Sequence, residues 1–315
     1  MRNIEEVINN LTTKEKARIC CGEGFWNSTA LPEHGIPAMN LTDGPHGVRK
    51  QEGASDHLGM NESTKTTCFP TAAGLAASWN RKLIAKVGAA IGEEAVAEDV
   101  HIVLGPGANI KRSPLGGRNF EYFSEDPYLT GELAAAHIKG MQSEGVGSSL
   151  KHFAVNNQET RRFNINAVID ERTLREIYLA GFESAVKQAK PLTVMSAYNQ
   201  INGEYCSQNK KLLTDILKDE WGFEGFVVSD WFAVCERDLG VEAGLDLEMP
   251  TSAGIGVQAI LEAAESGKLS EDKLNDAVLR ILKVVFKVGE VKQDNKGYDK
   301  ATHHALAQQA AHILM

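Results

Sequence analysis

Short apolar runs alternate with longer amphipathic segments along most of the chain. In the amphipathic segments apolar residues recur three or four positions apart, as at Leu274, Val278 and Ile281, and this spacing predicts helices with one buried face. Thr12 and Glu15 have the spacing of a capping box at a helix start. We expect helices over residues 4–20, 80–98, 127–144, 171–189, 209–221, 256–266 and 271–288.

The apolar runs are short and are typical of strands buried on both faces of a parallel sheet. Strands that alternate with helices indicate a parallel sheet or barrel. A chain of 315 residues favours one α/β domain, a (β/α)8 TIM-type barrel, over an open doubly wound sheet. The polar stretch 51–67 predicts a loop. The expected strands cover residues 39–42, 102–104, 149–150, 192–195, 226–228 and 245–249.

Polar residues follow almost every apolar run. Asp43 closes the first run, Lys151 and His152 follow another, and Tyr198 and Asp230 come just after two more. Because the carboxyl ends of parallel barrel strands meet on one face, these side chains should line one cup. Carboxylates accept hydrogen bonds from hydroxyl groups, while Lys and Arg donate to them. The pattern therefore predicts a ligand with several hydroxyl groups.

The amino-acid composition limits the kinds of partner and cofactor that we expect the chain to bind. A formal net charge of −9 weighs against nucleic acid and anionic membranes. We find no signal-peptide pattern at the N-terminus and no run long enough to span a membrane, so we expect a cytoplasmic protein. The five cysteines lack a CxxC pair, and the stretch 105–107 lacks the third glycine of a dinucleotide loop. We therefore expect neither a metal nor a cofactor.

At these strand ends the sequence resembles glycoside hydrolase family 3, the β-glucosidase type, from about Leu11 onwards. Seven segments occur in the family's order, and each lies where a strand is expected to end. They are LTDGPHGVR (41–49), FPTAAGLAASWN (69–80), KRSPLGGRNFEYFSEDP (111–127), SLKHFAVNNQETRR (149–162), VMSAYNQINGEYCSQN (194–209), GFVVSDW (225–231) and AGLDLEMP (243–250).

The resemblance implies a barrel, irregular at its first strands in some members, and roles for ten residues. Asp230, in the SDW motif, matches the family's catalytic nucleophile. Trp231 and Met195 are expected to wall the sugar ring. The remaining residues match groups of the sugar pocket: Asp43, Arg49, Arg118, Lys151, His152, Arg162 and Tyr198.

The implied reaction is removal of a terminal non-reducing β-D-glucosyl residue, with retention by double displacement. Such enzymes use two carboxyl groups about 5–5.5 Å apart, one a nucleophile and one an acid/base. Neighbouring Arg and Lys are expected to depress the pKa of Asp230 and keep it ionised. Asp43 and Arg49 favour glucose in a β-glucoside or short β-linked oligosaccharide, while a β-xylosidase-like specificity stays open.

The sequence departs from the family pattern in one respect. Family β-glucosidases carry a second α/β sandwich domain that supplies the acid/base glutamate, and we find no counterpart of that position. We expect the barrel over residues 1–300 and, over 301–315, a terminal helix that starts the linker to this missing domain. KHFAVNNQE (151–159) also lacks the histidine of the single-domain N-acetylglucosaminidase branch.

Weak activity alone is therefore expected. Three interpretations remain: a fragment of an enzyme, a carbohydrate-binding barrel completed by a separate second-domain polypeptide, or a barrel that binds sugar but hydrolyses it poorly. Apolar surface left uncovered by a second domain predicts self-association.

Competing interpretations exist for several of these residues. Asp43 could form an Asx-turn, although this is compatible with sugar binding. Arg118 could pair with Glu121. Arg162 could pair with Glu159, and Arg161 competes with it for the pocket.

Other residues are assigned structural roles. Glu248 is expected to support the end of the barrel. If the acid/base residue lies within this chain, Glu248 is the first candidate to test. Glu125 and Asp126 are expected to cap the helix that begins near Pro127. We place Trp79 and Trp221 in the core or an interface, and Trp231 as the only tryptophan of the pocket. The adjacent His303 and His304 are expected on a solvated helix face rather than at a metal.

Overall fold

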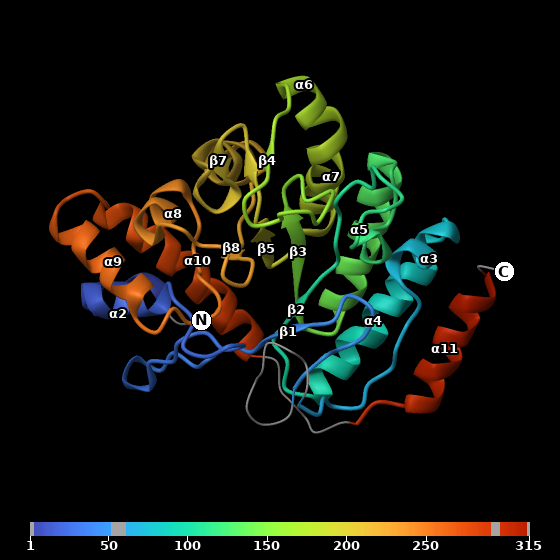
Figure 1. The fold of residues 1–315 in the computed structure, drawn as a ribbon. Coiled ribbons are helices and arrows are strands. Elements are labelled where there is room, and N and C mark those ends of the chain that lie inside the picture. Colours follow the sequence, from blue (N-terminus) through green and yellow to red (C-terminus); the bar gives the residue numbers. More distant parts are fainter. Residues whose placement is uncertain (1–2, 52–60, 291–296, 314–315) are drawn as a thin grey trace.

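Five short parallel strands form a curved sheet at the centre of the molecule (Figure 1). Each strand pairs with the next one along the chain, which is the order of a barrel wall. The structure, a computed structural model, describes residues 3–51, 61–290 and 297–313. The order is β1 (Leu41–Asp43), β2 (Ile102–Leu104), β3 (Gly147–Phe153), β5 (Thr193–Ser196) and β8 (Phe226–Ser229).

Irregular pairing continues the wall beyond β8. The segment around Leu247 pairs with β8 on one side and with the chain near Cys21 on the other. From Cys21, two antiparallel bridges lead back to Asn40, the residue before β1. The barrel is thus irregular where its first strands are expected. The isolated bridges that close the path are Val228–Leu247, Cys21–Glu248, Gly22–Ser28 and Asn27–Asn40.

The predicted strand over residues 245–249 is wrong as a regular strand. Arg237, which is buried in α8 (Arg237–Ala243), donates hydrogen bonds to the carbonyl oxygens of Leu245, Asp246 and Cys20, at 3.1, 2.7 and 2.8 Å. The guanidinium thus binds the carbonyls of Leu245 and Asp246, while the Cys20 carbonyl also accepts from the backbone N–H of Glu248. Only isolated bridges of this segment remain.

Helices surround the sheet close to where the periodicity predicts them. The predicted helix over 4–20 is two helices, because the chain turns at Asn10 and Leu11 and Thr12 caps the second helix through the expected capping box with Glu15. The helices are α1 (Ile4–Asn9), α2 (Thr13–Ile19), α3 (Ala72–Ala77), α4 (Arg81–Ala97), α5 (Pro127–Ser143), α6 (Glu171–Thr173), α7 (Ala180–Ala189), α8, α9 (Ile255–Glu265), α10 (Glu271–Gly289) and α11 (Lys300–Ile313).

Two of the predicted helices contain wider turns than the periodicity suggests. Residues Leu174–Leu179 form a π-helical stretch between α6 and α7, and Lys211–Glu220 are π-helical throughout. Both segments still bury an apolar face, for example through Leu179 and Ile216. Apolar spacing thus located the helices without fixing their type of turn.

The core lies on both sides of the sheet. Phe226 and Val228 pack into a cluster that includes Ile281 of α10, whereas Val227 between them packs into a cluster that includes Phe182 of α7. This alternation of neighbouring residues is that of a strand covered on both faces. In Figure 1 α8, α9 and α10 stand on one side of the sheet and α3, α4 and α5 on the other.

A smaller sheet lies beside the barrel. It consists of β4 (Asn166–Ala167), β6 (Gln200–Ile201) and β7 (Glu204–Tyr205). Asn202 and Gly203, which join β6 to β7, both have positive φ, as a tight hairpin turn requires. Of the predicted loop 51–67, residues 52–60 lie outside the described part, and Gln51 forms a bridge with Ser63.

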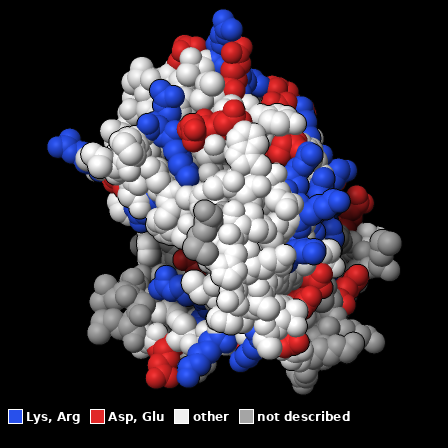
Figure 2. All heavy atoms as spheres, turned by 90° about the vertical axis from the view of Figure 1, so that its right-hand side faces the viewer, with Lys and Arg blue, Asp and Glu red and all other residues white. Residues whose placement is uncertain are grey.

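The helix α11 contacts α4 and α3 at the edge of the molecule (Figure 1). Figure 2 looks onto this side and shows a broad area without charged side chains, bordered by acidic and basic ones. A helix is thus present where the terminal helix is predicted. The domain boundary at residue 300 and the self-association of the chain stay predictions. None of the described helices has the length and apolar character of a membrane span.

Candidate active site

A cavity of about 330 Å³ lies at the carboxyl ends of the barrel strands. All ten residues that the sequence assigns to a site line it together. They are Asp43, Arg49, Arg118, Lys151, His152, Arg162, Met195, Tyr198, Asp230 and Trp231. The cavity is further lined by Phe25, Trp26, Leu104, Phe163 and Phe232. The residues from the strand-end argument and those from the family resemblance thus lie in one pocket.

Asp230 follows β8 directly and is buried, with 7% of its surface exposed. Its Oδ1 accepts a hydrogen bond of 2.7 Å from the backbone N–H of Trp231. Its Oδ2 accepts none from the residues that the structure describes. One oxygen of the carboxylate is therefore fixed and the other is left for a ligand.

The electrostatics of Asp230 differ from expectation. Burial raises its pKa, and the charges of Arg118 and Lys151 oppose the shift without reversing it. The expected depressed pKa is therefore wrong in direction for the unliganded site. The cations are present as predicted, but the loss of hydration outweighs them.

Lys151 lies at the centre of a charged cluster with Asp43, Glu121 and Arg118 at the pocket. Its ammonium lies 3.3 Å from Asp43 Oδ1 and 3.8 Å from Glu121 Oε2, and Glu121 also accepts a hydrogen bond from Nε of Arg118. Burial raises the pKa of Asp43, but the charges of Lys151, Arg49 and Arg118 outweigh it and the net shift is downward. Asp43 is thus held as a carboxylate, and its side chain bonds Lys151 rather than an Asx-turn.

The arginines serve both of the roles considered for them. Arg118 pairs with Glu121 and still lines the pocket. Arg162 pairs with Glu159 at 3.3 Å, and its guanidinium lies over the ring of Tyr198 at 4.5 Å from the centroid. Arg161 is exposed and does not line the cavity.

His152 is enclosed by partners on both ring nitrogens. Its Nε2 lies 2.9 Å from Nη2 of Arg118, and its Nδ1 lies 3.0 Å from the hydroxyl of Tyr122. Burial, with Arg118 and Lys151 adding to it, lowers the pKa of His152 well below its ordinary value. The imidazole is therefore neutral in the unliganded site.

Aromatic rings form one wall of the pocket. Trp231 donates a hydrogen bond of 2.8 Å from Nε1 to the carbonyl of Phe25, and its ring lies 5.2 Å from that of Trp26. The prediction that Trp231 is the only tryptophan of the pocket is wrong, because Trp26 lines it too. Tyr198 donates to the carbonyl of Trp231 at 2.9 Å, which ties this wall to β5.

Other acids of the chain serve the fold. Glu248 does not line the pocket; its Oε2 accepts a hydrogen bond of 3.0 Å from Ser252 and lies 4.0 Å from Nε of Arg237. This agrees with its assigned support of the barrel end. Asp126 caps α5 through a hydrogen bond of 2.7 Å from the N–H of Leu129, with Pro127 at the first helical position, as expected.

Of the two adjacent histidines in α11, His304 is exposed but His303 is buried. The ring of His303 lies 2.8 Å from Glu94 Oε1 and 3.1 Å from Glu93 Oε2, both on α4. The prediction of a solvated face is therefore wrong for His303. These two contacts join the buried imidazole of α11 to α4.

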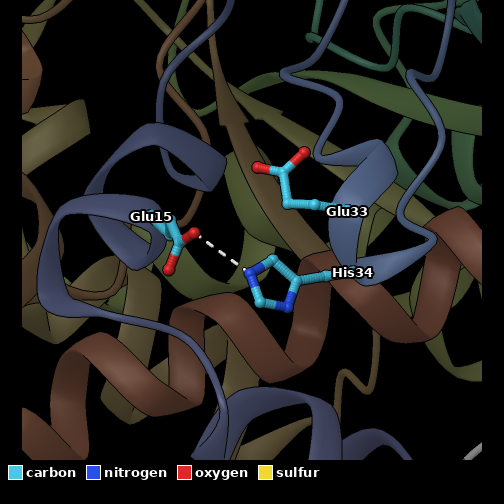
Figure 3. Close-up of side chains that lie close together, drawn as sticks. All are labelled: Glu15, Glu33 and His34. Carbon is cyan, nitrogen blue, oxygen red and sulfur yellow. Dashed lines mark hydrogen bonds and ion pairs between the residues drawn. The ribbon is translucent and has the colours of Figure 1, made fainter.

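Glu15, Glu33 and His34 form a cluster away from the pocket, with ligand-type atoms within 4.8 Å of one another (Figure 3). Figure 3 shows Glu15 bonded to His34 and the carboxylate of Glu33 turned away from that bond. Glu15 also accepts from the N–H and O–H of Thr12. The cluster thus belongs to the start of α2, and we assign it no metal.

A larger cavity, about 610 Å³, lies at the opposite end of the barrel, where the chain enters β5 and β8. It contains none of the predicted site residues. Its charged lining consists of Lys190, Lys218, Arg280, Lys283, Lys287, Glu224 and Asp276. Although this cavity is larger, we place the candidate active site at the other face, because the polar residues at the strand ends converge there.

Comparison with known proteins agrees with this geometry. Residues 28–284 match the glycosyl hydrolase family 3 N-terminal domain. The chain is 61% identical to thermostable β-glucosidase B of Acetivibrio thermocellus over 309 residues, which are 98% of this chain and 41% of that protein. It is 47% identical to exo-α-(1→6)-L-arabinopyranosidase of Bifidobacterium breve over 96% of this chain and 40% of that protein.

Solved structures resemble the barrel closely. β-Glucosidase 3B of Thermotoga neapolitana in complex with glucose superimposes with a TM-score of 0.93 at 42% identity, over 99% of this chain and 47% of that chain. The likeness confirms the predicted barrel fold. The chain spans about two fifths of the length of the curated relatives named above. Because the family domain matches most of its residues, this chain belongs to glycoside hydrolase family 3.

Proposed function

We propose that this chain forms the sugar-binding barrel of a retaining exo-β-glucosidase, with Asp230 as the nucleophile. The observation that carries the proposal is the state of Asp230, a buried carboxylate in the pocket whose Oδ2 accepts no hydrogen bond from the described residues. Attack of Oδ2 on the anomeric carbon would form a covalent glycosyl–enzyme, which water then hydrolyses.

The surrounding groups suit a sugar in this position. Asp43, held as a carboxylate, accepts hydrogen bonds from sugar hydroxyls, and Lys151 and Arg118 donate to them. Bonds of this kind that shorten as the ring approaches an oxocarbenium ion lower the barrier. Met195 and Trp231 enclose the ring's apolar faces. The same two cations stabilise the carboxylate of Asp230 when water displaces it from the sugar in the second step.

The acid/base belongs to another part of the protein in this proposal. The carboxylates that line the described pocket are Asp43 and Asp230. Asp43 makes a poor proton donor because Lys151 and Arg49 help to hold its pKa below the ordinary value. A second domain, joined in cis or docked in trans, would supply the acid, in keeping with the greater length of the relatives. The barrel alone would then hydrolyse only glycosides whose leaving group needs no protonation.

The glycone is proposed to be glucose. Relatives named β-glucosidase and a structural neighbour in complex with glucose favour it. The relative named exo-α-(1→6)-L-arabinopyranosidase favours a second candidate, a pyranose without a C6 hydroxymethyl group. Rates on activated β-glucoside, β-xyloside and α-L-arabinopyranoside would rank these sugars directly.

The nucleophile is tested by chemical rescue. Asp230→Asn should abolish turnover of 2,4-dinitrophenyl β-glucoside, and in Asp230→Ala, where the place of the carboxylate is vacant, added azide should restore release of dinitrophenol with α-glucosyl azide as the product. Glu125→Gln, at an exposed acid, is the matched control and should behave as the unaltered chain. Full turnover by Asp230→Asn without azide would remove Asp230 from the mechanism.

The alternative of a binding barrel completed by a separate polypeptide has its own test. Adding the second-domain region of a relative in trans should increase hydrolysis of cellobiose, whose leaving group needs an acid. Normal turnover of cellobiose by the 315-residue chain alone would contradict both the missing acid and the subunit interpretation.

A further inference from the structure

Four side chains form a hydrogen-bonded chain that runs from the interior into the pocket. Nδ2 of Asn156 lies 3.0 Å from the hydroxyl of Tyr122, which lies 3.0 Å from Nδ1 of His152. Nε2 of His152 lies 2.9 Å from Nη2 of Arg118. His152 and Arg118 line the pocket, whereas Tyr122 and Asn156 are buried behind them. The sequence assigned no role to either of these two.

The direction of the bonds is fixed at both ends. A guanidinium offers only donors, so Arg118 must donate to Nε2 of His152, and that nitrogen carries no proton. At the other end the Nδ2 atom of Asn156 is also 3.2 Å from Glu159 Oε1. A carboxylate only accepts, so this atom is the amide nitrogen, and Asn156 donates to the oxygen of Tyr122.

These directions determine the tautomer of His152. The ring is neutral, because burial and the charges of Arg118 and Lys151 lower its pKa. A neutral imidazole holds one proton, and Nε2 is occupied by the Arg118 donor. The proton is therefore on Nδ1, where it is donated to the oxygen of Tyr122.

The tautomer matters because of Asp230. Nε2 of His152 lies 3.7 Å from Asp230 Oδ2, the oxygen that accepts no hydrogen bond from the described residues. A proton on Nε2 would be drawn to this carboxylate oxygen and would lower both its pKa and its nucleophilicity. With the proton on Nδ1, the lone pair of Nε2 accepts from Arg118, and Oδ2 of Asp230 stays uncovered.

We propose that Tyr122 and Asn156 are positioning residues that keep the proton of His152 on Nδ1 and so leave Oδ2 of Asp230 free to attack. Neither residue touches the sugar. The inference rests on the proposed role of Asp230 for its effect on rate, but not for the tautomer itself. The two parts are therefore measured separately.

The tautomer is read by long-range ¹H–¹⁵N correlation spectra of the 315-residue chain labelled at histidine, with the His152 signal identified by its loss in His152→Gln. The unaltered chain should show a protonated Nδ1 and an unprotonated Nε2. Tyr122→Phe keeps the ring but removes the acceptor of the Nδ1 proton, so part of the population should move the proton to Nε2, with Arg118 turning away from that nitrogen. Tyr128→Phe, at a residue 73% exposed, is the matched control and should leave the spectrum unchanged.

The effect on rate is read from formation of the covalent adduct with 2,4-dinitrophenyl 2-deoxy-2-fluoro-β-glucoside. Tyr122→Phe should slow this step by roughly tenfold, the scale of one hydrogen bond, while glucose affinity changes little. A proton on Nε2 in the unaltered chain would overturn the proposal, and this outcome does not depend on whether Tyr122→Phe folds. A tautomer shift in Tyr122→Phe without a slower step would overturn the role in reactivity. If Asp230 is not the nucleophile, the unaltered chain itself forms no adduct there, whereas the spectra still report the tautomer.

Discussion

The ammonium of Lys151 lies 3.3 Å from the carboxylate of Asp43, although 108 residues separate them in sequence. Asp43 ends β1 and Lys151 lies in β3, with β2 between the two strands. Glu121, 3.8 Å from the same ammonium, joins Arg118 to this pair. Two carboxylates and two cations thus hold one another in place at the pocket. Changing a member of this cluster should alter the binding of a sugar.

Replacing Lys151 by Met should weaken glucose binding. The change removes a donor to the sugar and leaves Asp43 and the buried Glu121 with less compensating charge. A hydrogen bond to a charged group contributes about 1.5–3 kcal/mol, and the partial exposure of Asp43 favours the lower end, about tenfold in affinity. Calorimetric titration with glucose measures it. Lys187→Met, at an exposed ion pair with Glu183, is the control and should bind normally.

The pH dependence should reveal the raised pKa of Asp230. A raised pKa means that the carboxyl is already protonated at a pH where an ordinary aspartate, with a pKa near 3.8, would still be ionised. The rate of adduct formation should therefore fall, as pH is lowered, before that ordinary value is reached. Asp43, whose pKa is lowered, should remain ionised in this range and glucose should still bind. An acid limb at or below the ordinary aspartate range would contradict this account.

Strand-end polarity was the most informative feature of the sequence. Asp43, Lys151 and Asp230 each follow a buried apolar run, so the barrel alone places them at one face. Arg118 and Arg162 lie in longer loops, and only the family resemblance indicated them. The structure brings these loops over the same cavity.

The residues that were missed lack a local signal. Trp26 belongs to the irregular part of the wall, where isolated bridges replace a strand and no apolar run marks the position. Glu121 lies three residues after Arg118 in sequence, but its contact with Lys151 depends on the tertiary structure. The pKa of Asp230 depends on how strongly burial raises it and how strongly nearby charges lower it. The sequence alone does not give the relative size of these two effects.

The adjacent histidines of α11 offer a matched test of how this helix is held. His303→Ala removes the bonds to Glu93 and Glu94 and should lower the free energy of unfolding by about 1–3 kcal/mol, because the fully buried Glu94 loses a partner. His304→Ala, one residue on but exposed, should change it by less than about 0.5 kcal/mol. Urea denaturation at pH 7 compares the two variants. Equal effects would mean that His303 does not anchor α11.

Tryptophan emission should report on the ligand. Trp26 and Trp231 line the pocket, so glucose should change their fluorescence. Trp231→Phe should reduce the change, whereas Trp79→Phe should preserve it because Trp79 is 74% exposed and outside the cavity. A response lost in Trp79→Phe but kept in Trp231→Phe would place the sugar elsewhere.

The central claim, that Asp230 attacks the sugar, is tested most directly by peptide mass spectrometry after incubation with 2,4-dinitrophenyl 2-deoxy-2-fluoro-β-glucoside. The leaving group needs no acid, and the fluorine slows the hydrolysis step, so the covalent intermediate accumulates even if the acid/base lies in another domain. The account predicts one sugar on the peptide that contains Asp230 and none in Asp230→Asn. A sugar on any other carboxylate, or equal labelling of Asp230→Asn, would contradict it.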